Sequence, residues 1–189
     1  PRGVERLRRW SKDEKIVWNC IEASRIGNTE VKPTPDQIRS EVWMSLIRGS
    51  RGLIYFVHQF APTFKEASLL DDPELLEGVT SINRQVIELA PVLNSPDITD
   101  AIVFASPQPE TPIQVLVKRY QGSLYLLASN ESPKPAAATL QVTVPLADGA
   151  QLKPIADGSP IELRDAKFKL ELPGYGIGLY RLDESSPRP

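Results

Sequence analysis

Two short runs of almost wholly apolar residues, separated by a helical pattern, constrain the fold of this chain more than any other feature. The runs span 16–21 and 53–57 and are rich in branched and aromatic side chains. Such runs are typical of strands buried on both faces, which occur in parallel sheets covered by helices. Helical patterns occupy 4–10, 34–49 and 72–91. The order helix, strand, helix, strand, helix therefore predicts a parallel α/β arrangement.

The middle helix has clear start and stop signals. Thr34, Pro35 and Gln37 have the spacing of a capping box, with threonine as the N-cap, proline at the first helical position and glutamine at the third. Gly49 follows the last apolar position, where glycine commonly ends a helix. We therefore expect a helix that begins just after Thr34 and ends just before Gly49.

The next helix follows an acidic pair. Asp71 and Asp72 have the composition of a metal-binding pair, but Pro73 comes directly after them. Proline favours the first position of a helix, so Asp72 is better explained as its N-cap. We expect this helix to continue along an apolar stripe and to end at Pro91.

The connections between these elements differ in length. About four residues, 49–52, join the middle helix to the next strand, whereas 23–33 and 60–72 are roughly three times as long. Long connections after parallel strands build the active face of barrels and open sheets. Two parallel strands cannot close a sheet, so we expect further strands upstream. The chain begins with Pro1 and shows no natural start, which also suggests a piece of a longer protein.

The C-terminal half has a different pattern. Strand-like runs at 113–120 and 124–129 flank the turn 121–123, which predicts a β-hairpin. Further alternating runs separated by turn signals predict an antiparallel β-sandwich; they lie at 140–144, 151–155, 168–172 and 177–182. We therefore expect two domains, 1–95 and 96–184, followed by a disordered tail at 185–189.

Composition excludes several classes of function. The net charge of -2 gives no basic surface for nucleic acid, and no apolar run reaches the roughly 18 residues that a membrane span needs. The chain has one histidine, one cysteine, no glycine-rich phosphate loop and no nucleophile elbow, so neither a metal site nor a cofactor is expected. Cys20 lies in an apolar run, where a thiol behaves as a small hydrophobe. Trp18 and Trp43 are expected to fill the core.

Three segments resemble a known group of enzymes. The stretches "KIVWNCIEAS", "PTPDQIRSEVWMSLIRGSRGLIYFVHQF" and "NRQVIELAPVLNSP" resemble the end of the catalytic barrel in bacterial glycoside hydrolases of the retaining (β/α)8-barrel clan, especially its β-galactosidase-like and cellulase-like members. The segments "YLLASN" and "GIGLYRLD" are similar to the β-sandwich that often follows such barrels.

The resemblance implies a fold of class α/β plus all-β. It would consist of the last two strands and helices of a (β/α)8 (TIM) barrel, present only in part, followed by the antiparallel β-sandwich. It also implies a carbohydrate substrate, and secretion or a periplasmic location. Neither the resemblance nor the pattern of residues specifies an oligomeric state.

The same resemblance assigns a role to Glu22. The strand that ends at Glu22 would be barrel strand seven, where enzymes of this clan carry the nucleophilic glutamate. Such a carboxylate attacks the anomeric carbon while a second acid, roughly 5 Å away, protonates the leaving oxygen. The second acid belongs to strand four, which this chain lacks, so the chain alone would be inactive. Glu22 also fits a simpler description, an ordinary solvated carboxylate after a strand.

Four other residues are candidate substrate contacts. The strand that ends at His58 would be barrel strand eight. This residue, the only histidine, fits a core residue, a surface residue or a group that touches sugar hydroxyls. Gln59 would point to the opposite face if the strand continues. Asn19 and Ser24 lie near the end of the preceding strand, whereas Arg25 fits a solvated loop charge.

Two classes of function compete at this point. The chain belongs either to a glycosidase or to a non-catalytic carbohydrate-binding or spacer protein. A sugar-binding sandwich needs exposed aromatic rings, yet several of those in the C-terminal half fall at inward positions of alternating strands; they are Phe104, Tyr120, Tyr125, Phe168, Tyr175 and Tyr180. This pattern favours a structural appendage. A barrel that has lost its activity is a third possibility.

Overall fold

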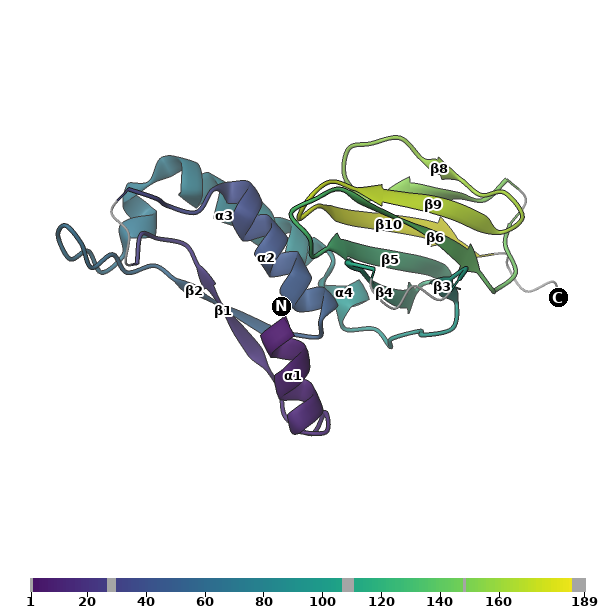
Figure 1. The fold of residues 1–189 in the computed structure, drawn as a ribbon, viewed down its shortest axis with the longest axis horizontal. Helices are drawn as coiled ribbons and strands as arrows, with labels where there is room; N and C mark the ends of the chain where they lie inside the picture. The colour runs from purple at the N-terminus through teal and green to yellow at the C-terminus, as the bar shows by residue number, and fades with distance from the viewer. Residues whose placement is uncertain (1, 27–29, 107–110, 148, 185–189) are drawn as a thin grey trace. The chain divides into compact units, whose positions relative to one another are not determined.

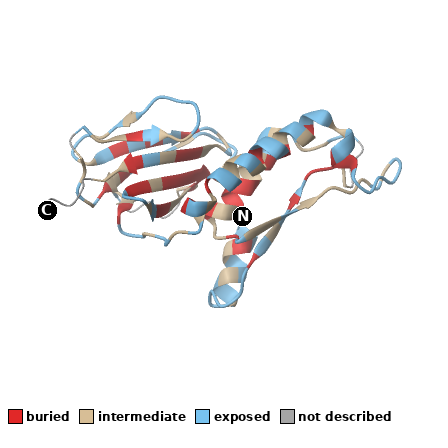
Figure 2. Ribbon diagram, turned by 180° about the vertical axis from the view of Figure 1, so that it is seen from behind, coloured by how far each residue is buried: buried red, intermediate tan, exposed pale blue. Residues whose placement is uncertain are grey.

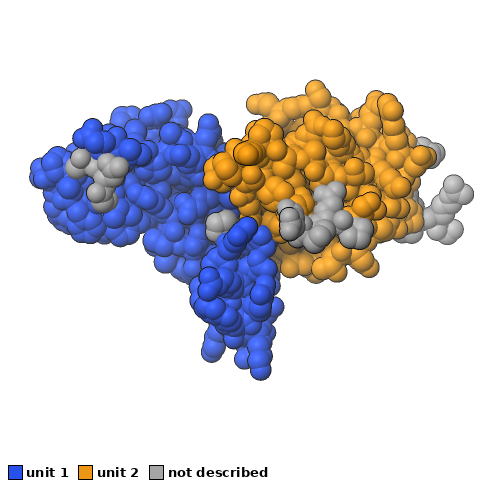
Figure 3. All heavy atoms as spheres, in the orientation of Figure 1, with its two compact units in different colours: residues 1–88 blue, residues 89–189 orange. Residues whose placement is uncertain are grey.

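The protein forms two compact units, residues 1–88 and 89–189 (Figure 3). A computed structural model describes residues 2–26, 30–106, 111–147 and 149–184 of the 189-residue chain. A parallel pair of strands with helices is followed by antiparallel sheets, which confirms the predicted change of architecture. The domain boundary between residues 95 and 96 stays a prediction, and the expected disordered tail at 185–189 lies outside the described residues.

The first unit contains a two-stranded parallel sheet (Figure 1). In chain order its elements are α1 (Arg2–Trp10), β1 (Trp18–Glu22), α2 (Pro35–Ile47), β2 (Gly52–Phe56), the 3-10 helix η1 (Ser68–Asp71) and α3 (Pro73–Glu88). In the ladder Trp18 lies opposite Gly52 and Glu22 lies opposite Phe56. Among the described residues, no helix combines the length and the apolar character needed to cross a bilayer.

The predicted helix signals of α2 are all present. The Thr34 hydroxyl accepts a hydrogen bond from the Gln37 N–H at 3.3 Å, and the Gln37 side chain accepts one from the Thr34 N–H at 2.9 Å. Gly49 follows the C-cap with a φ of +92°, in the left-handed region that favours glycine. Local hydrogen bonding therefore sets both ends of this helix.

The end of α3 differs from the prediction. The helix ends at Glu88, and Pro91 lies in the first turn of the next short helix, α4 (Ala90–Leu93). Proline is tolerated there because an N–H in the first turn has no partner within the helix. The expectation that Pro91 itself stops α3 is therefore wrong.

Helices α2 and α3 cover only one face of the strand pair. Alternate residues of the strands, such as Ile21 and Tyr55, pack with Val42 and Val79 of these helices. The opposite face carries Trp18, which is 60% exposed, and β1 and β2 hold few buried residues (Figure 2). We call this second side the uncovered face.

The two tryptophan predictions had different outcomes. Trp43 has no exposed surface and donates its Nε1–H to the Gln85 side chain at 3.1 Å, which confirms a core role. Trp18 does not fill the core, and Cys20 beside it is also exposed. The prediction for Trp18 failed because no described element of this unit covers that side of the sheet.

The second unit consists of two antiparallel sheets. After α4 its strands are β3 (Ile102–Phe104), β4 (Ile113–Tyr120), β5 (Ser123–Asn130), β6 (Ala136–Val142), β7 (Gln151–Pro154), β8 (Ile161–Glu162), β9 (Lys167–Leu172) and β10 (Ile177–Asp183). The sheets have the orders β4-β5-β10-β7-β8 and β3-β6-β9. Buried residues from both sheets, such as Leu126 and Leu140, form one apolar core.

The predicted hairpin joins β4 to β5. Its turn has two residues, Gln121 and Gly122, with φ of 49° and 73°, while Ser123 already pairs with Tyr120. Positive φ at both central positions matches the right-handed twist of the flanking strands. The hairpin is therefore confirmed, with a turn one residue shorter than the predicted span 121–123.

A buried lysine ties the start of this unit to its sheet. Lys118 of β4 is only 2% exposed; its ammonium forms an ion pair with Asp97 at 2.5 Å and donates to the Ser95 carbonyl at 2.7 Å. The Ile98 N–H donates to the Val117 carbonyl at 2.9 Å. Residues 95–98 are therefore part of the folded unit, because they neutralise a charge that would otherwise be buried alone.

This contact predicts how much of the chain the second unit needs. The segment 89–184 should unfold in one cooperative transition, whereas 100–184 should be less stable by about 3 kcal/mol, because Lys118 loses both partners. Urea unfolding followed by circular dichroism measures the difference. Lys118→Met should reduce the difference in stability between the two segments, since an uncharged methionine needs neither Asp97 nor Ser95 as a partner. Equal stability of the two unsubstituted segments would contradict this role of Asp97 and Ser95.

Candidate functional site at the carboxyl ends of the parallel strands

Glu22 is the last residue of β1 and lies on the uncovered face. It is exposed and pairs in the ladder with Phe56, while the next residue, Ala23, is buried on the helix-covered side. Burial raises the pKa of the Glu41 carboxyl on α2, and the negative charge of Glu22 adds to this rise. The charge of Glu22 therefore acts electrostatically on Glu41.

Four rings form an aromatic cluster at the carboxyl end of β2. His58 meets Phe56 edge to face at 5.5 Å and stacks on Phe64 at 6.1 Å between ring centroids. Phe60 and Phe64 lie 5.9 Å apart and are 56% and 59% exposed. The His58 Nδ1 is buried and has no hydrogen-bond partner within the described part of the chain.

The segment that carries Phe60 and Phe64 is held at its base. Gln59 and Lys65 exchange two backbone hydrogen bonds, of 3.0 and 2.9 Å. The ammonium of Lys65 also forms an ion pair with Asp71 at 2.9 Å. The exposed rings are thus presented on a small hairpin that is joined to η1.

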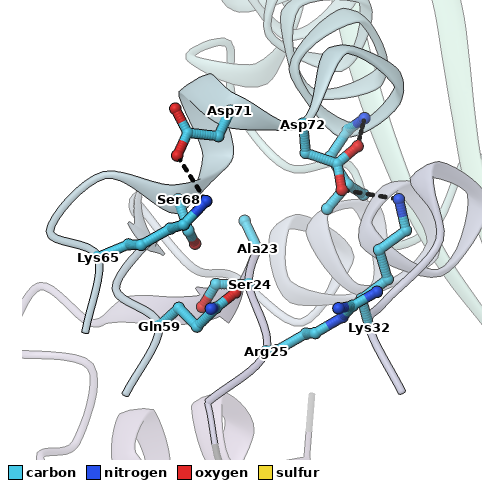
Figure 4. A pocket seen from close by; sticks show the side chains of 10 residues that line it. Ala23, Ser24, Arg25, Lys32, Gln59, Lys65, Ser68, Asp71 and Asp72 are labelled. Carbon is cyan, nitrogen blue, oxygen red and sulfur yellow. Dashed lines mark hydrogen bonds and ion pairs between the residues drawn. The ribbon is translucent and has the colours of Figure 1, made fainter. Parts of the chain in front are cut away.

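A polar pocket of about 180 Å³ lies between the loops that follow β1 and β2 (Figure 4). It is lined by Ala23, Ser24, Arg25, Lys32, Gln59, Lys65, Ser68, Asp71, Asp72 and Leu75. Two hydroxyls brace its walls: Ser24 donates to the His58 carbonyl at 2.7 Å, and Ser68 donates to the Val57 carbonyl at 2.8 Å. These bonds tie both loops to the end of β2.

Ion pairs order the charged side chains of the pocket. Lys32 lies 2.7 Å from Asp72 and 3.1 Å from Glu74, and the hydrogen bond to Asp72 is the main cause of its raised pKa. Partial burial of Asp72 pushes its pKa upward, but hydrogen bonds from Lys32 and from the Leu75 N–H outweigh this and lower the pKa. Asp72 is therefore ionised, and it caps α3 as predicted.

The five predicted site residues fall into three places. Glu22 and His58 lie at the uncovered face and the aromatic cluster, whereas Ser24 and Gln59 line the polar pocket. Asn19 lies mid-strand against α2, where it donates to the Ser45 hydroxyl at 2.7 Å. No group of three or more histidine, cysteine or acidic side chains suited to a metal ion occurs in the described ranges.

Sequence reasoning missed most of the pocket. Lys32, Lys65 and Ser68 are scattered along two loops and have no common spacing, and Arg25 was expected to be a loop charge. Their one shared signal is position, since all follow the carboxyl ends of parallel strands, the edge where ligands bind in such sheets. That rule indicates an edge of the sheet and does not select residues.

Comparisons with known proteins identify a related fold. No protein-family model and no curated protein sequence matches this chain. An α-amylase from Geobacillus thermoleovorans, solved with acarbose, matches with a TM-score of 0.64 and 12% identity over 95% of this chain and 43% of its own. An Anoxybacillus α-amylase gives a TM-score of 0.61 and 12% identity over 92% of this chain and 39% of its own.

A third match is AmyP in complex with maltose, with a TM-score of 0.56 and 7% identity over 88% of this chain and 41% of its own. The chain thus spans about two fifths of the length of the solved structures it matches. The likeness extends over most of this chain and, at these identities, concerns the fold alone.

The Lys32–Asp72 ion pair predicts a pH-dependent stability. Because the pKa of Asp72 is lowered on folding, its contribution is complete above the ordinary carboxyl pKa and is lost as the pH falls through the lowered value. Asp72→Asn keeps an N-cap and should destabilise the first unit by about 1 kcal/mol at neutral pH. The destabilisation caused by Asp72→Asn should become smaller below about pH 4.

Tryptophan fluorescence measures this unit, because Trp10, Trp18 and Trp43 all lie within it. The matched control is Glu77→Gln, which removes an exposed carboxylate from α3 outside the pocket. A destabilisation by Asp72→Asn that is the same at pH 3 and pH 7 would argue against the ion pair.

Proposed function

We propose that this chain is the C-terminal part of a glycoside hydrolase of the retaining (β/α)8-barrel clan, with Glu22 as the nucleophile. The observation that carries the proposal is the position of Glu22, the last residue of a parallel strand, on the face without helices. In a closed barrel the helices surround the strands, so the side without helices faces the barrel axis. Catalytic residues of barrel enzymes come from the carboxyl ends of such strands.

The proposed chemistry needs two carboxyl groups. Glu22 would attack the anomeric carbon and form a glycosyl–enzyme intermediate, while a carboxylic acid on another strand protonates the leaving oxygen. Water would then release the sugar as that second group acts as a base. The acid partner lies outside this chain in the proposal, so the isolated chain is expected to bind sugar without cleaving it.

The aromatic cluster supports a carbohydrate substrate. Exposed rings such as those of Phe60 and Phe64 offer flat apolar surfaces, and sugar rings present matching C–H faces. His58 lies between Phe56 and Phe64, on the same side of β2 as Phe56, and would touch a sugar bound beside Glu22. The solved relatives bound to acarbose and to maltose support the same class of ligand.

The antiparallel unit is proposed to have a structural role. Phe168 is buried, and Phe104 and Tyr180 pack against the common core of the two sheets. Tyr120 and Tyr125 are partly buried, which leaves Tyr175 as the exposed ring among the described aromatics of this unit. A platform for stacking sugars needs several exposed rings, so this distribution favours a supporting unit over a binding module.

The nucleophile assignment is tested in the longer enzyme that would contain this chain. Glu22→Gln keeps the size and shape of the side chain, so the fold should survive while kcat falls by several powers of ten, since attack takes place only in the transition state. Steady-state kinetics on an aryl glycoside measures kcat and KM separately. A near-normal kcat in this variant would show that Glu22 is an ordinary carboxylate at the end of a strand.

Chemical rescue is a second test of the nucleophile assignment. In Glu22→Ala, azide or formate should partly restore cleavage of an activated substrate, because the small anion occupies the vacated space and attacks in place of the carboxylate. The matched control is Glu88→Gln, which removes an exposed carboxylate from the end of α3. Its kcat should equal that of the unchanged enzyme, with or without azide.

A further inference from the structure

The polar pocket is distinct from the proposed nucleophile. Its wall includes Ala23 and Gln59, which directly follow Glu22 and His58 in the chain, yet it lies between the two loops near the start of α3. Figure 4 shows that the charged groups of the pocket come from both loops and from η1. The catalytic proposal for Glu22 uses none of these charged side chains.

The charges of the pocket are balanced once the ion-pair partners of its lining residues are included. The lining has three cationic side chains, Arg25, Lys32 and Lys65, and two carboxylates, Asp71 and Asp72. Lys65 pairs with Asp71, the positive charge of Arg25 acts on Asp72, and Lys32 pairs with Asp72 and also with Glu74, which does not line the pocket. Counted with Glu74, the three cationic groups are matched by three carboxylates. A pocket without excess charge gives no strong preference for an anion or a cation, so its ligand is expected to be neutral.

Donors and acceptors are nevertheless abundant. An ammonium group has three donor hydrogens and a carboxylate has about four acceptor sites, so each ion pair retains hydrogen-bonding capacity. The Gln59 side chain makes one long hydrogen bond, to the Thr63 carbonyl at 3.4 Å. At about 180 Å³ the pocket is smaller than the roughly 300 Å³ at which pockets for drug-sized ligands begin, so it has room for one small ligand.

We propose that the polar pocket binds a single neutral sugar unit of the substrate through its hydroxyl groups. A pyranose carries several hydroxyls that both donate and accept, which matches the alternating ammonium, carboxylate and amide groups of the wall. The identification of this sugar as part of a substrate rests on the function proposed for Glu22. The pocket then selects the unit that extends past the strand ends, and the aromatic cluster supports the sugar at the reacting bond.

Equilibrium binding to the 189-residue chain tests this proposal without turnover. Methyl glucoside and methyl galactoside are titrated by NMR, and at least one should bind with a millimolar Kd, as expected for a small polar ligand. Gln59→Leu should weaken binding about tenfold, because it removes neutral hydrogen bonds at similar volume. Lys65→Met should weaken it by at least about tenfold, because a charged donor is lost.

The exposed Lys65–Asp71 ion pair contributes little to stability, so these variants should fold, and tryptophan fluorescence checks this. Glu77→Gln is the matched control and should leave Kd unchanged. Binding of neither glycoside, equal Kd values in all the variants, or binding of sulfate and galacturonate in preference to both glycosides would overturn the proposal.

The nucleophile proposal and the pocket proposal can be contradicted independently of each other. The chemical shift of the Gln59 side-chain amide reports binding at the polar pocket, and Glu22→Gln should leave the Kd measured there unchanged, because Glu22 does not line the pocket. If Glu22→Gln keeps its kcat in the longer enzyme while Gln59→Leu still weakens sugar binding, the nucleophile is wrong and the sugar pocket stands. If kcat is lost but no glycoside binds to the chain, the pocket proposal is wrong and the nucleophile stands.

Discussion

The parallel pairing of β1 with β2 is the contact on which both candidate sites depend. It places Glu22 opposite Phe56, and the Ala23 N–H continues the ladder to the Phe56 carbonyl at 2.9 Å. Successive residues of a strand point to opposite sides. This register therefore determines which side chains lie on the uncovered face and which lie on the helix-covered side. A slip of one residue would exchange the two sets of side chains.

Helix α2 and the hairpin of the second unit could be predicted because their signals are local. Thr34 and Gln37 cap one another across three residues, and Gly122 provides the positive φ that a two-residue turn requires. Strands β3 and β8 were not found, since three and two residues are too few to show an alternating pattern. Such strands depend on partners far away in the sequence.

The features that sequence reasoning did not reach are non-local. Trp18 lies in an apolar run and was expected to be buried, but burial depends on what covers the sheet and not on the run itself. The candidate site was predicted only as an edge of the sheet, with Glu22, His58, Gln59, Asn19 and Ser24 on or near it. Lys32, from the loop after β1, meets Asp72 through the fold, so no spacing in the sequence predicts the pair.

Gly52 limits which substitutions this protein can accept during evolution. A Cβ atom at this position would lie 2.5 Å from the ring of Trp18, closer than atoms in real structures approach. The indole therefore occupies the space that any larger residue at 52 would need. A larger residue at position 52 is therefore tolerated only if the indole moves or a smaller side chain replaces Trp18, whereas a smaller residue at position 18 leaves Gly52 free to stay.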